Sequence, residues 1–145
     1  MHTIRPLETA DWAGWSALWG GYLGFYRAAL SDETSRATFE RLCAGTEGLF
    51  GLFATDEGGA PVGLANCVVH ATTWSRRPKC YLEDLFVSPA ARGGELGQAL
   101  LRAVKQAATD RGAPDVYWHT QQYNGRARSL YDVVGRPTSF VVYEM

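Results

Sequence analysis

Residues 81–101 constrain the fold of this chain more than any other segment, because three structural signals follow one another there without a gap. An apolar, β-prone run from Tyr81 to Val87 leads into a glycine-rich turn, and the turn passes directly into a helical pattern. Such a turn aims backbone N–H groups and the positive end of a helix dipole at one place. The sequence therefore predicts a site for a phosphate-bearing ligand there.

Composition indicates a compact domain and excludes several classes of protein. The chain has 145 residues with 46% hydrophobic content, so residues 1–145 are expected to form one domain. A net charge of −1 gives no reason to expect nucleic-acid or membrane-surface binding. There is no run of 18 apolar residues and no signal-peptide pattern, so we expect a cytoplasmic protein without a membrane partner.

The cysteines do not indicate a disulfide or a metal site. Cys43, Cys67 and Cys80 are odd in number, lack CxxC spacing and lie in apolar stretches. They are expected to be reduced core residues, and no metal is expected.

Hydrophobic periodicity and turn residues predict ten elements in the order βααβββαβαβ. Strands are expected at 3–5, 49–55, 62–71, 81–87, 116–120 and 140–143, and helices from 11 and at 31–43, 95–111 and 124–134. A strand–helix–strand crossover makes 81–87 and 116–120 parallel. The predicted fold is α/β (α+β), a mixed, mostly antiparallel sheet with one parallel pair and about four flanking helices.

These elements and several motifs resemble the Gcn5-related N-acetyltransferases, the GNAT superfamily. The acyl-CoA signature of that family, Arg/Gln-x-x-Gly-x-Gly/Ala after the fourth strand, is matched by the segment from Arg92 to Gly97. The run 81–89 with Arg92-Gly93, together with Asn124 and Tyr131, is similar to the spermidine/spermine and thialysine acetyltransferase group. The resemblance covers nearly the whole chain and implies acetyl-CoA as cosubstrate.

One position departs from the signature: Glu95 stands where the family usually has its first glycine. A side chain and a negative charge there would oppose close approach of the pyrophosphate. A carboxylate in the first helical turn also favours the helix dipole, and its N–H can still bind the ligand. We expect acetyl-CoA to bind, with Glu95→Gly binding it more tightly.

The resemblance implies a set of cofactor-binding residues. The pantetheine arm is expected to pair with the backbone of the fourth strand, and the pyrophosphate with the turn and the helix start. The residues concerned are Leu85, Phe86, Val87, Arg92, Gly93, Gly94, Glu95, Leu96, Gly97, Gln98 and Asn124. Asn124 serves equally well as a helix N-cap, and the two roles are compatible.

Tyr131 is the candidate general acid. A phenol remains protonated at neutral pH and can donate a proton to the departing thiolate. Its position also suits a core tyrosine on an amphipathic helix beside Leu130 and Val134. The match to the family favours the catalytic role.

Glu83 is the candidate general base, acting through a water molecule, and with Asp84 it is expected to receive a cationic amine. Strict alternation would place Tyr81, Glu83 and Leu85 on one face and Leu82, Asp84 and Phe86 on the other. A carboxylate in an apolar strand is either at a site or paired in a core network.

Further residues have weaker assignments. His119 is an alternative base because imidazole titrates near neutrality, and His70 has less positional support. Trp12, Trp15, Trp19, Tyr22 and Tyr26 form an aromatic stripe that is mostly core, although Tyr22, Phe25 and Tyr26 are suited to wall an amine pocket. The basic cluster Arg76-Arg77-Pro78-Lys79 is read as a solvated turn.

The sequence thus predicts transfer of an acetyl group from acetyl-CoA to a primary amine of a small molecule, a polyamine or a lysine-like amine. Acetylation of a protein lysine or N-terminus is one alternative. A non-catalytic acyl-CoA-binding module is another, because of Glu95 in the signature. A homodimer is expected, since a last strand at 140–143 leaves an edge that a partner can cover.

Overall fold

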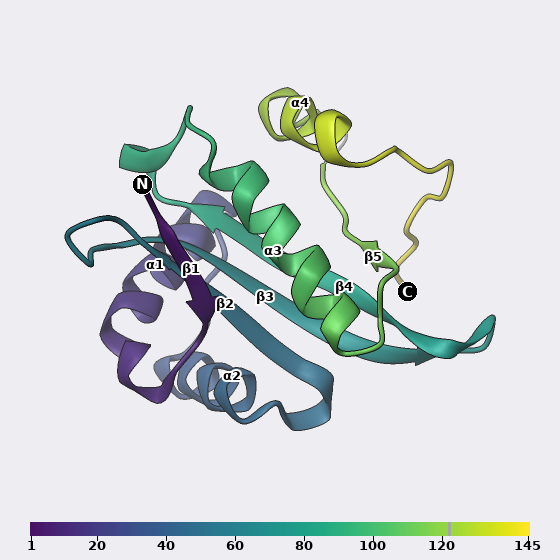
Figure 1. Cartoon of the computed structure of the whole chain (residues 1–145), viewed down its shortest axis with the longest axis horizontal. Coiled ribbons are helices and arrows are strands. Elements are labelled where there is room, and N and C mark those ends of the chain that lie inside the picture. Colours follow the sequence, from purple (N-terminus) through teal and green to yellow (C-terminus); the bar gives the residue numbers. More distant parts are fainter. Residues whose placement is uncertain (122) are drawn as a thin grey trace.

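The fold is a five-stranded sheet with helices on both faces (Figure 1). A computed structural model describes residues 1–121 and 123–145. The helices α1 (Trp12–Phe25) and α2 (Asp32–Ala44) pack on one face, and α3 (Leu96–Asp110) packs on the other. The shorter α4 (Gly125–Val134) contacts α3.

The strands follow their order in the chain across the sheet. They are β1 (Thr3–Pro6), β2 (Leu49–Thr55), β3 (Pro61–Thr72), β4 (Ser75–Val87) and β5 (Val116–Tyr117). Neighbours from β1 to β4 are antiparallel, and β5 is parallel to β4. The mixed sheet with one parallel pair, predicted from the sequence, is confirmed.

The helix ends follow the local signals in the sequence. Ser31 caps α2, its hydroxyl accepting a hydrogen bond from the Thr34 N–H, and Gly45 ends the helix at φ +71°. Asn124 caps α4, its side-chain oxygen accepting from the Ala127 N–H at 3.3 Å. The N-cap role predicted for Asn124 is therefore confirmed.

Two hydrophobic clusters lie on opposite faces of the sheet. The first joins the apolar side of α3 to β2, β3 and β4, and it includes the fully buried Cys67 and Cys80. The second joins α1 and α2 to the sheet around Trp15 and Phe39. The aromatic stripe of α1 is a continuous series of ring contacts from Trp12 to Tyr26, and its far end is exposed.

The sequence-based prediction was wrong at three places. The strand β4 begins at Ser75 rather than at 81, because β3 and β4 continue pairing to a tight hairpin at Thr72 and Ser75. The basic residues expected in a loop therefore lie on β4. The strand β5 is limited to Val116–Tyr117, and residues 140–143 form no strand.

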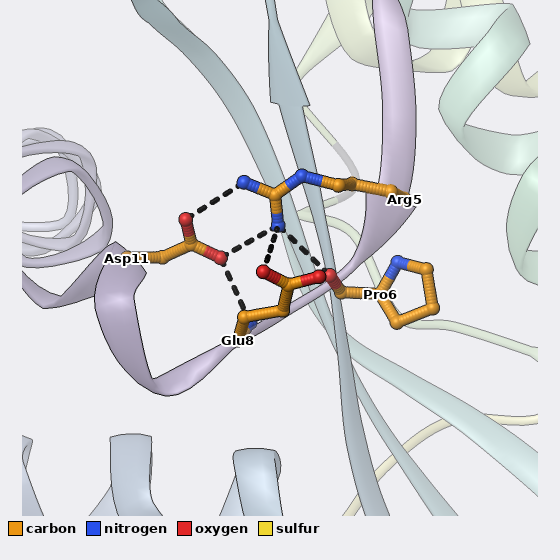
Figure 2. A network of polar contacts seen from close by, with 4 residues as sticks. All are labelled: Arg5, Pro6, Glu8 and Asp11. Atoms are coloured by element: carbon orange, nitrogen blue, oxygen red, sulfur yellow. Dashed lines mark hydrogen bonds and ion pairs between the residues drawn. The ribbon is translucent and has the colours of Figure 1, made fainter.

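A salt bridge fastens β1 to the start of α1 (Figure 2). Both guanidinium Nη atoms of Arg5 donate to the Asp11 carboxylate at 2.8 Å, and the Glu8 N–H donates to the same carboxylate at 2.8 Å. The Asp11 side chain is 9% exposed. The hydrogen bond from Arg5 holds the pKa of Asp11 below its ordinary value.

Asp11→Asn is expected to destabilise the protein by about 1–3 kcal/mol at neutral pH, because a charged, bidentate hydrogen bond is lost. The folded-state pKa of Asp11 is lowered, so its contribution is present above the ordinary value of 3.8 and is lost as pH falls through the folded-state value. Urea unfolding at neutral and acidic pH measures this effect. The exposed pair Arg41 and Glu47 supplies the control, Glu47→Gln, expected to cost about 0–1 kcal/mol. An equal loss for both variants at both pH values would contradict the prediction.

Candidate active site

A β-bulge interrupts the pairing of β4 with β3 near the middle of the sheet. Asp84 pairs with Asn66 and Leu82 pairs with Cys67, which leaves Glu83 without a partner residue on β3. The extra residue shifts the alternation of side chains by one position. Leu82 and Leu85 consequently pack into the same cluster against α3, whereas Phe86 packs toward α1.

The bulge corrects the expectation that Glu83 and Asp84 lie on opposite faces. Asp84 contacts the Tyr22 side chain of α1, and Glu83 lines a pocket with Tyr22 and Tyr26. Strict alternation fails here because one inserted residue turns both acidic side chains toward the same region.

The pocket gathers residues from α1, β4, α4 and the segment after β5. It is small, and it brings together most of the residues that the sequence suggested for catalysis and acceptor binding. Its lining consists of Tyr22, Tyr26, Leu82, Glu83, Leu85, Trp118, His119 and Tyr131. Asp84 is not among the lining residues, but it is hydrogen-bonded to Tyr22, which is.

Asp84 belongs to a polar network that reaches into the core. The Trp15 Nε1–H donates to Asn66 Oδ1 at 3.3 Å, and Asn66 Nδ2 donates to Asp84 Oδ2 at 3.1 Å. Burial raises the pKa of Asp84, and the bonds from Asn66 and Tyr22 oppose that rise. Burial and the nearby Asp84 charge raise the pKa of Tyr22, so its hydroxyl stays a donor.

Tyr131, on α4, is half-buried against the segment after β5. Its ring meets that of Trp118 edge-on, with ring centroids 5.4 Å apart. Burial raises the pKa of Tyr131 above its ordinary value of 10.0. The hydroxyl is therefore a proton donor throughout the neutral range.

His119 lies beside two stacked aromatic rings, one on β4 and one on β5. Its Nδ1 lies 3.2 Å from the Tyr81 hydroxyl, and Tyr81 stacks on Tyr117 with centroids 5.0 Å apart. The other candidate histidine, His70, lies outside this pocket, and its Nε2 is 2.6 Å from the Tyr117 hydroxyl. Of the two, only His119 lines the pocket.

The glycine-rich turn ends at the N-terminus of α3, as predicted. Gly93 has φ +86°, and Glu95 is the N-cap residue of α3 without a side-chain capping bond. The first N–H groups of a helix have no partner within it, so Leu96, Gly97 and Gln98 present donors at this end. Those donors fit the pyrophosphate of acetyl-CoA.

Glu95 adopts a backbone conformation open to any residue, with φ −92°. Its side chain is exposed, so its Cβ causes no crowding in the turn. The departure from the signature thus changes charge rather than backbone shape.

The remaining cofactor residues have defined surroundings. Leu85 and Val87 are half-buried against the α3 cluster, and Phe86 is buried against Tyr22. The Arg92 Nε–H donates to the Val87 carbonyl at 3.0 Å, so this side chain folds back on the end of β4. Gly94 lies in the turn between β4 and α3.

Two functional candidates were missing from the sequence-based set. Trp118 lines the pocket and packs on Tyr131, and nothing in its local pattern marked it. Asn66 supports Asp84 from a strand that is otherwise apolar, and a buried amide in such a strand was a readable signal.

Other features of the described residues lie apart from this pocket. A cavity of about 390 Å³ between α2 and β2 contains none of the predicted site residues. Within residues 1–121 and 123–145 no group of three or more metal-ligating side chains occurs. No helix of this described part is long and apolar enough to cross a membrane.

A strand–turn–helix with free helix N–H groups, beside a pocket lined by Tyr131 and Glu83, suits the class of acyl-CoA-dependent acyltransferases. Residues 15–135 match the model of the acetyltransferase (GNAT) family. The chain belongs to this family, and it is an acetyl-CoA-dependent N-acetyltransferase.

Comparison with individual proteins agrees with this family assignment. The chain is 35% identical over 142 residues to the D-amino-acid N-acetyltransferase HPA3 of Saccharomyces cerevisiae, covering 97% of this chain and 88% of that protein. It is 32% identical over 79 residues to the thialysine N-epsilon-acetyltransferase of Bos taurus, covering 54% of this chain and 46% of that one. The solved structure of AAC(6')-Iy with a bisubstrate analogue has the same fold, with a TM-score of 0.87, 19% identity, and coverage of 100% and 97%.

Proposed function

We propose that this enzyme acetylates a primary amine of a small molecule, in the pocket between α1, β4 and α4. The observation that supports the proposal is the convergence of Glu83, His119 and Tyr131 in one pocket whose walls include Tyr22 and Tyr26. Aromatic faces and carboxylates both attract an ammonium group. A cationic acceptor, such as a polyamine or a lysine-like amine, suits this lining.

Acetyl-CoA is proposed to lie along the end of β4 and the turn. The N–H groups of residues 96–98 would hold the pyrophosphate, and the backbone of residues 85–87 would pair with the pantetheine amides. An N–H from the same strand segment would polarise the thioester carbonyl. Asn124 would then have two roles: it caps α4, and it forms one hydrogen bond with the pantetheine arm.

The proposed reaction is direct transfer. Glu83, through a water molecule, takes a proton from the acceptor ammonium, and the free amine attacks the thioester carbon. A nitrogen–carbon bond forms, the carbon–sulfur bond breaks, and the Tyr131 hydroxyl gives its proton to the departing thiolate. The new amide nitrogen loses its second proton to water, and the Tyr131 oxygen regains a proton from solvent. Asp84 remains hydrogen-bonded to Tyr22 and attracts the cationic acceptor.

Release of the CoA thiol, measured against a panel of amines, tests the acceptor. The panel contains polyamines, lysine analogues, D- and L-amino acids, an aminoglycoside and a basic peptide. Turnover on a small amine that falls in Tyr131→Phe and persists in Tyr123→Phe, an exposed tyrosine, supports the proposal. Turnover confined to the peptide would identify a protein substrate instead.

Glu95→Gly is expected to bind acetyl-CoA more tightly than the natural enzyme. The Glu95 carboxylate lies at the N-terminus of α3, where the pyrophosphate is proposed to bind. Repulsion between exposed charges is worth about 1 kcal/mol or less, which corresponds to a gain in affinity of up to about fivefold. Titration calorimetry at low salt measures the change.

Glu95→Gln separates charge from shape, because it removes the charge and keeps the side chain. Since the backbone at Glu95 is unstrained, Glu95→Gln is expected to bind acetyl-CoA as tightly as Glu95→Gly. Unchanged or weaker binding in both variants would contradict the placement of the pyrophosphate.

A further inference from the structure

Two stacked tyrosines extend one wall of the candidate pocket along β4 and β5. Tyr81 pairs with Tyr117 across these strands, and their rings lie with centroids 5.0 Å apart and planes at 18°. The centroid of the His119 ring, which lines the pocket, lies 5.2 Å from that of Tyr81. The wall therefore continues from His119 over both tyrosines, in the direction that leads along β4 away from Glu83.

A lysine lies at the far end of this wall. The Lys79 Nζ lies 5.3 Å from the centroid of the Tyr117 ring, and the residue is half-buried on β4. Arg77, two residues earlier, pairs with Asp115 at 3.7 Å. None of the salt bridges formed by residues 1–121 and 123–145 involves Lys79. Within this part of the chain, Lys79 is therefore a cation without a carboxylate partner.

The Tyr117 ring beneath Lys79 is held in place from β3. His70 Nδ1 lies 2.8 Å from the Ala71 carbonyl, which can only accept, so the neutral imidazole carries its proton on Nδ1. Its Nε2, 2.6 Å from the Tyr117 oxygen, then accepts from that hydroxyl. Lys79 itself is the residue paired with His70 across β3 and β4. The lysine and the ring that supports it are thus fixed by contacts from a neighbouring strand.

We propose that Lys79 binds a carboxylate of the acceptor, at a distance from the amine that is acetylated. The acceptor is then an elongated amino carboxylate, with its amine beside Glu83 and its chain against the Tyr81 and Tyr117 rings. A polyamine is disfavoured, because its second ammonium group would lie beside the lysine. The inference rests on the proposed function, which places the reacting amine in the pocket.

The strand sets the length of this acceptor. Four residues of β4 separate Glu83 from Lys79, a span of about 13 Å for an extended strand. The lysine side chain shortens that span, because its Nζ lies over Tyr117, the partner of the midway residue Tyr81. The amine and the carboxylate of the acceptor are therefore expected to be about 7–13 Å apart.

Matched acceptors test this site. ω-Aminooctanoate is compared with ω-aminooctanamide, which keeps the amine and the chain and lacks the negative charge. The natural enzyme is expected to favour the carboxylate by about fivefold to tenfold in kcat/KM, through KM rather than kcat. Free glycine and glycinamide are expected to show no such preference, because a carboxylate next to the amine cannot reach Lys79. Equal kcat/KM values for the two long acceptors would overturn the inference.

Variants of Lys79 assign the preference to this side chain. Lys79→Gln is expected to raise KM for ω-aminooctanoate to that for the amide. Lys79→Glu is expected to reverse the preference, so that a diamine of the same length becomes the better acceptor. The control Arg76→Gln removes an equal charge from an exposed position on the same strand, and it is expected to keep the preference. A preference that survives in Lys79→Gln, or that Arg76→Gln also removes, would overturn the inference.

Titration calorimetry separates the fate of this inference from that of the proposed function. Small amines that are acetylated without a preference for the carboxylate would overturn the Lys79 site and leave the proposed function standing. If no small amine is acetylated, the proposed function fails, and titration of the CoA-bound enzyme with both long acceptors still decides the site. Tighter binding of ω-aminooctanoate that is lost in Lys79→Gln would support it, and equal or absent binding of the two would overturn it.

Discussion

Replacing Tyr131 with Phe is expected to lower kcat by about 100-fold while the dissociation constant of acetyl-CoA stays unchanged. The proposed loss is that of a positioned general acid, a contribution of about 10²–10⁴ in rate. The Phe ring keeps the edge-on contact with Trp118, so the packing of α4 is retained. Single-turnover kinetics and titration with acetyl-CoA measure the two quantities separately.

Two further measurements make this prediction specific. An acetyl donor with a more acidic thiol needs less protonation on leaving, so Tyr131→Phe is expected to recover rate with such a donor. Tyr123→Phe, which alters a tyrosine that is 83% exposed, is expected to keep full activity with both donors. Full activity of Tyr131→Phe with acetyl-CoA itself would remove Tyr131 from the mechanism.

Glu83→Gln is expected to lower kcat/KM for the acceptor by about 10²–10³, since the proposed proton acceptor is lost. Glu83 is exposed, so this change should leave the fold intact. In the natural enzyme the rate should increase with pH as more acceptor amine becomes deprotonated. Glu83→Asp, which keeps a carboxylate, is expected to restore part of the rate that Glu83→Gln loses.

His119→Gln distinguishes the alternative base in the same pocket. If Glu83 is the base, His119→Gln lowers kcat/KM by less than tenfold and leaves the shape of the pH profile unchanged. Tyr81→Phe removes the hydroxyl that meets His119 Nδ1, so it should reproduce any effect of histidine orientation. A large loss in His119→Gln combined with an active Glu83→Gln would assign the base to His119.

Much of the fold follows from local patterns. The strand β2, the N-cap of α2, the cap of α4 and the turn before α3 were predicted closely because each depends on neighbouring residues. The early start of β4 was missed, because Arg76 and Arg77 are poor strand signals that hairpin pairing with β3 overrides.

In the candidate site, too, the sequence identified some residues and missed others. Sequence motifs selected Tyr131, Glu83 and the turn, and the pocket contains the first two. Trp118 and Asn66 were missed because their importance comes from contacts between distant parts of the chain. The exposure of residues 140–143 was not predicted either, since a continuous apolar, β-prone run predicts a strand whether or not a sheet edge is there to pair with it.

The sequence by itself determined the family, the order of the elements up to α4 and the glycine-rich turn before α3, because these depend on residue types at short spacing. Only the tertiary structure decided which way Glu83 and Asp84 face. That outcome depends on the bulge opposite Asn66 and Cys67, a pairing between two strands whose register is set by packing on both faces of the sheet. A one-residue insertion in that register cannot be read from local periodicity.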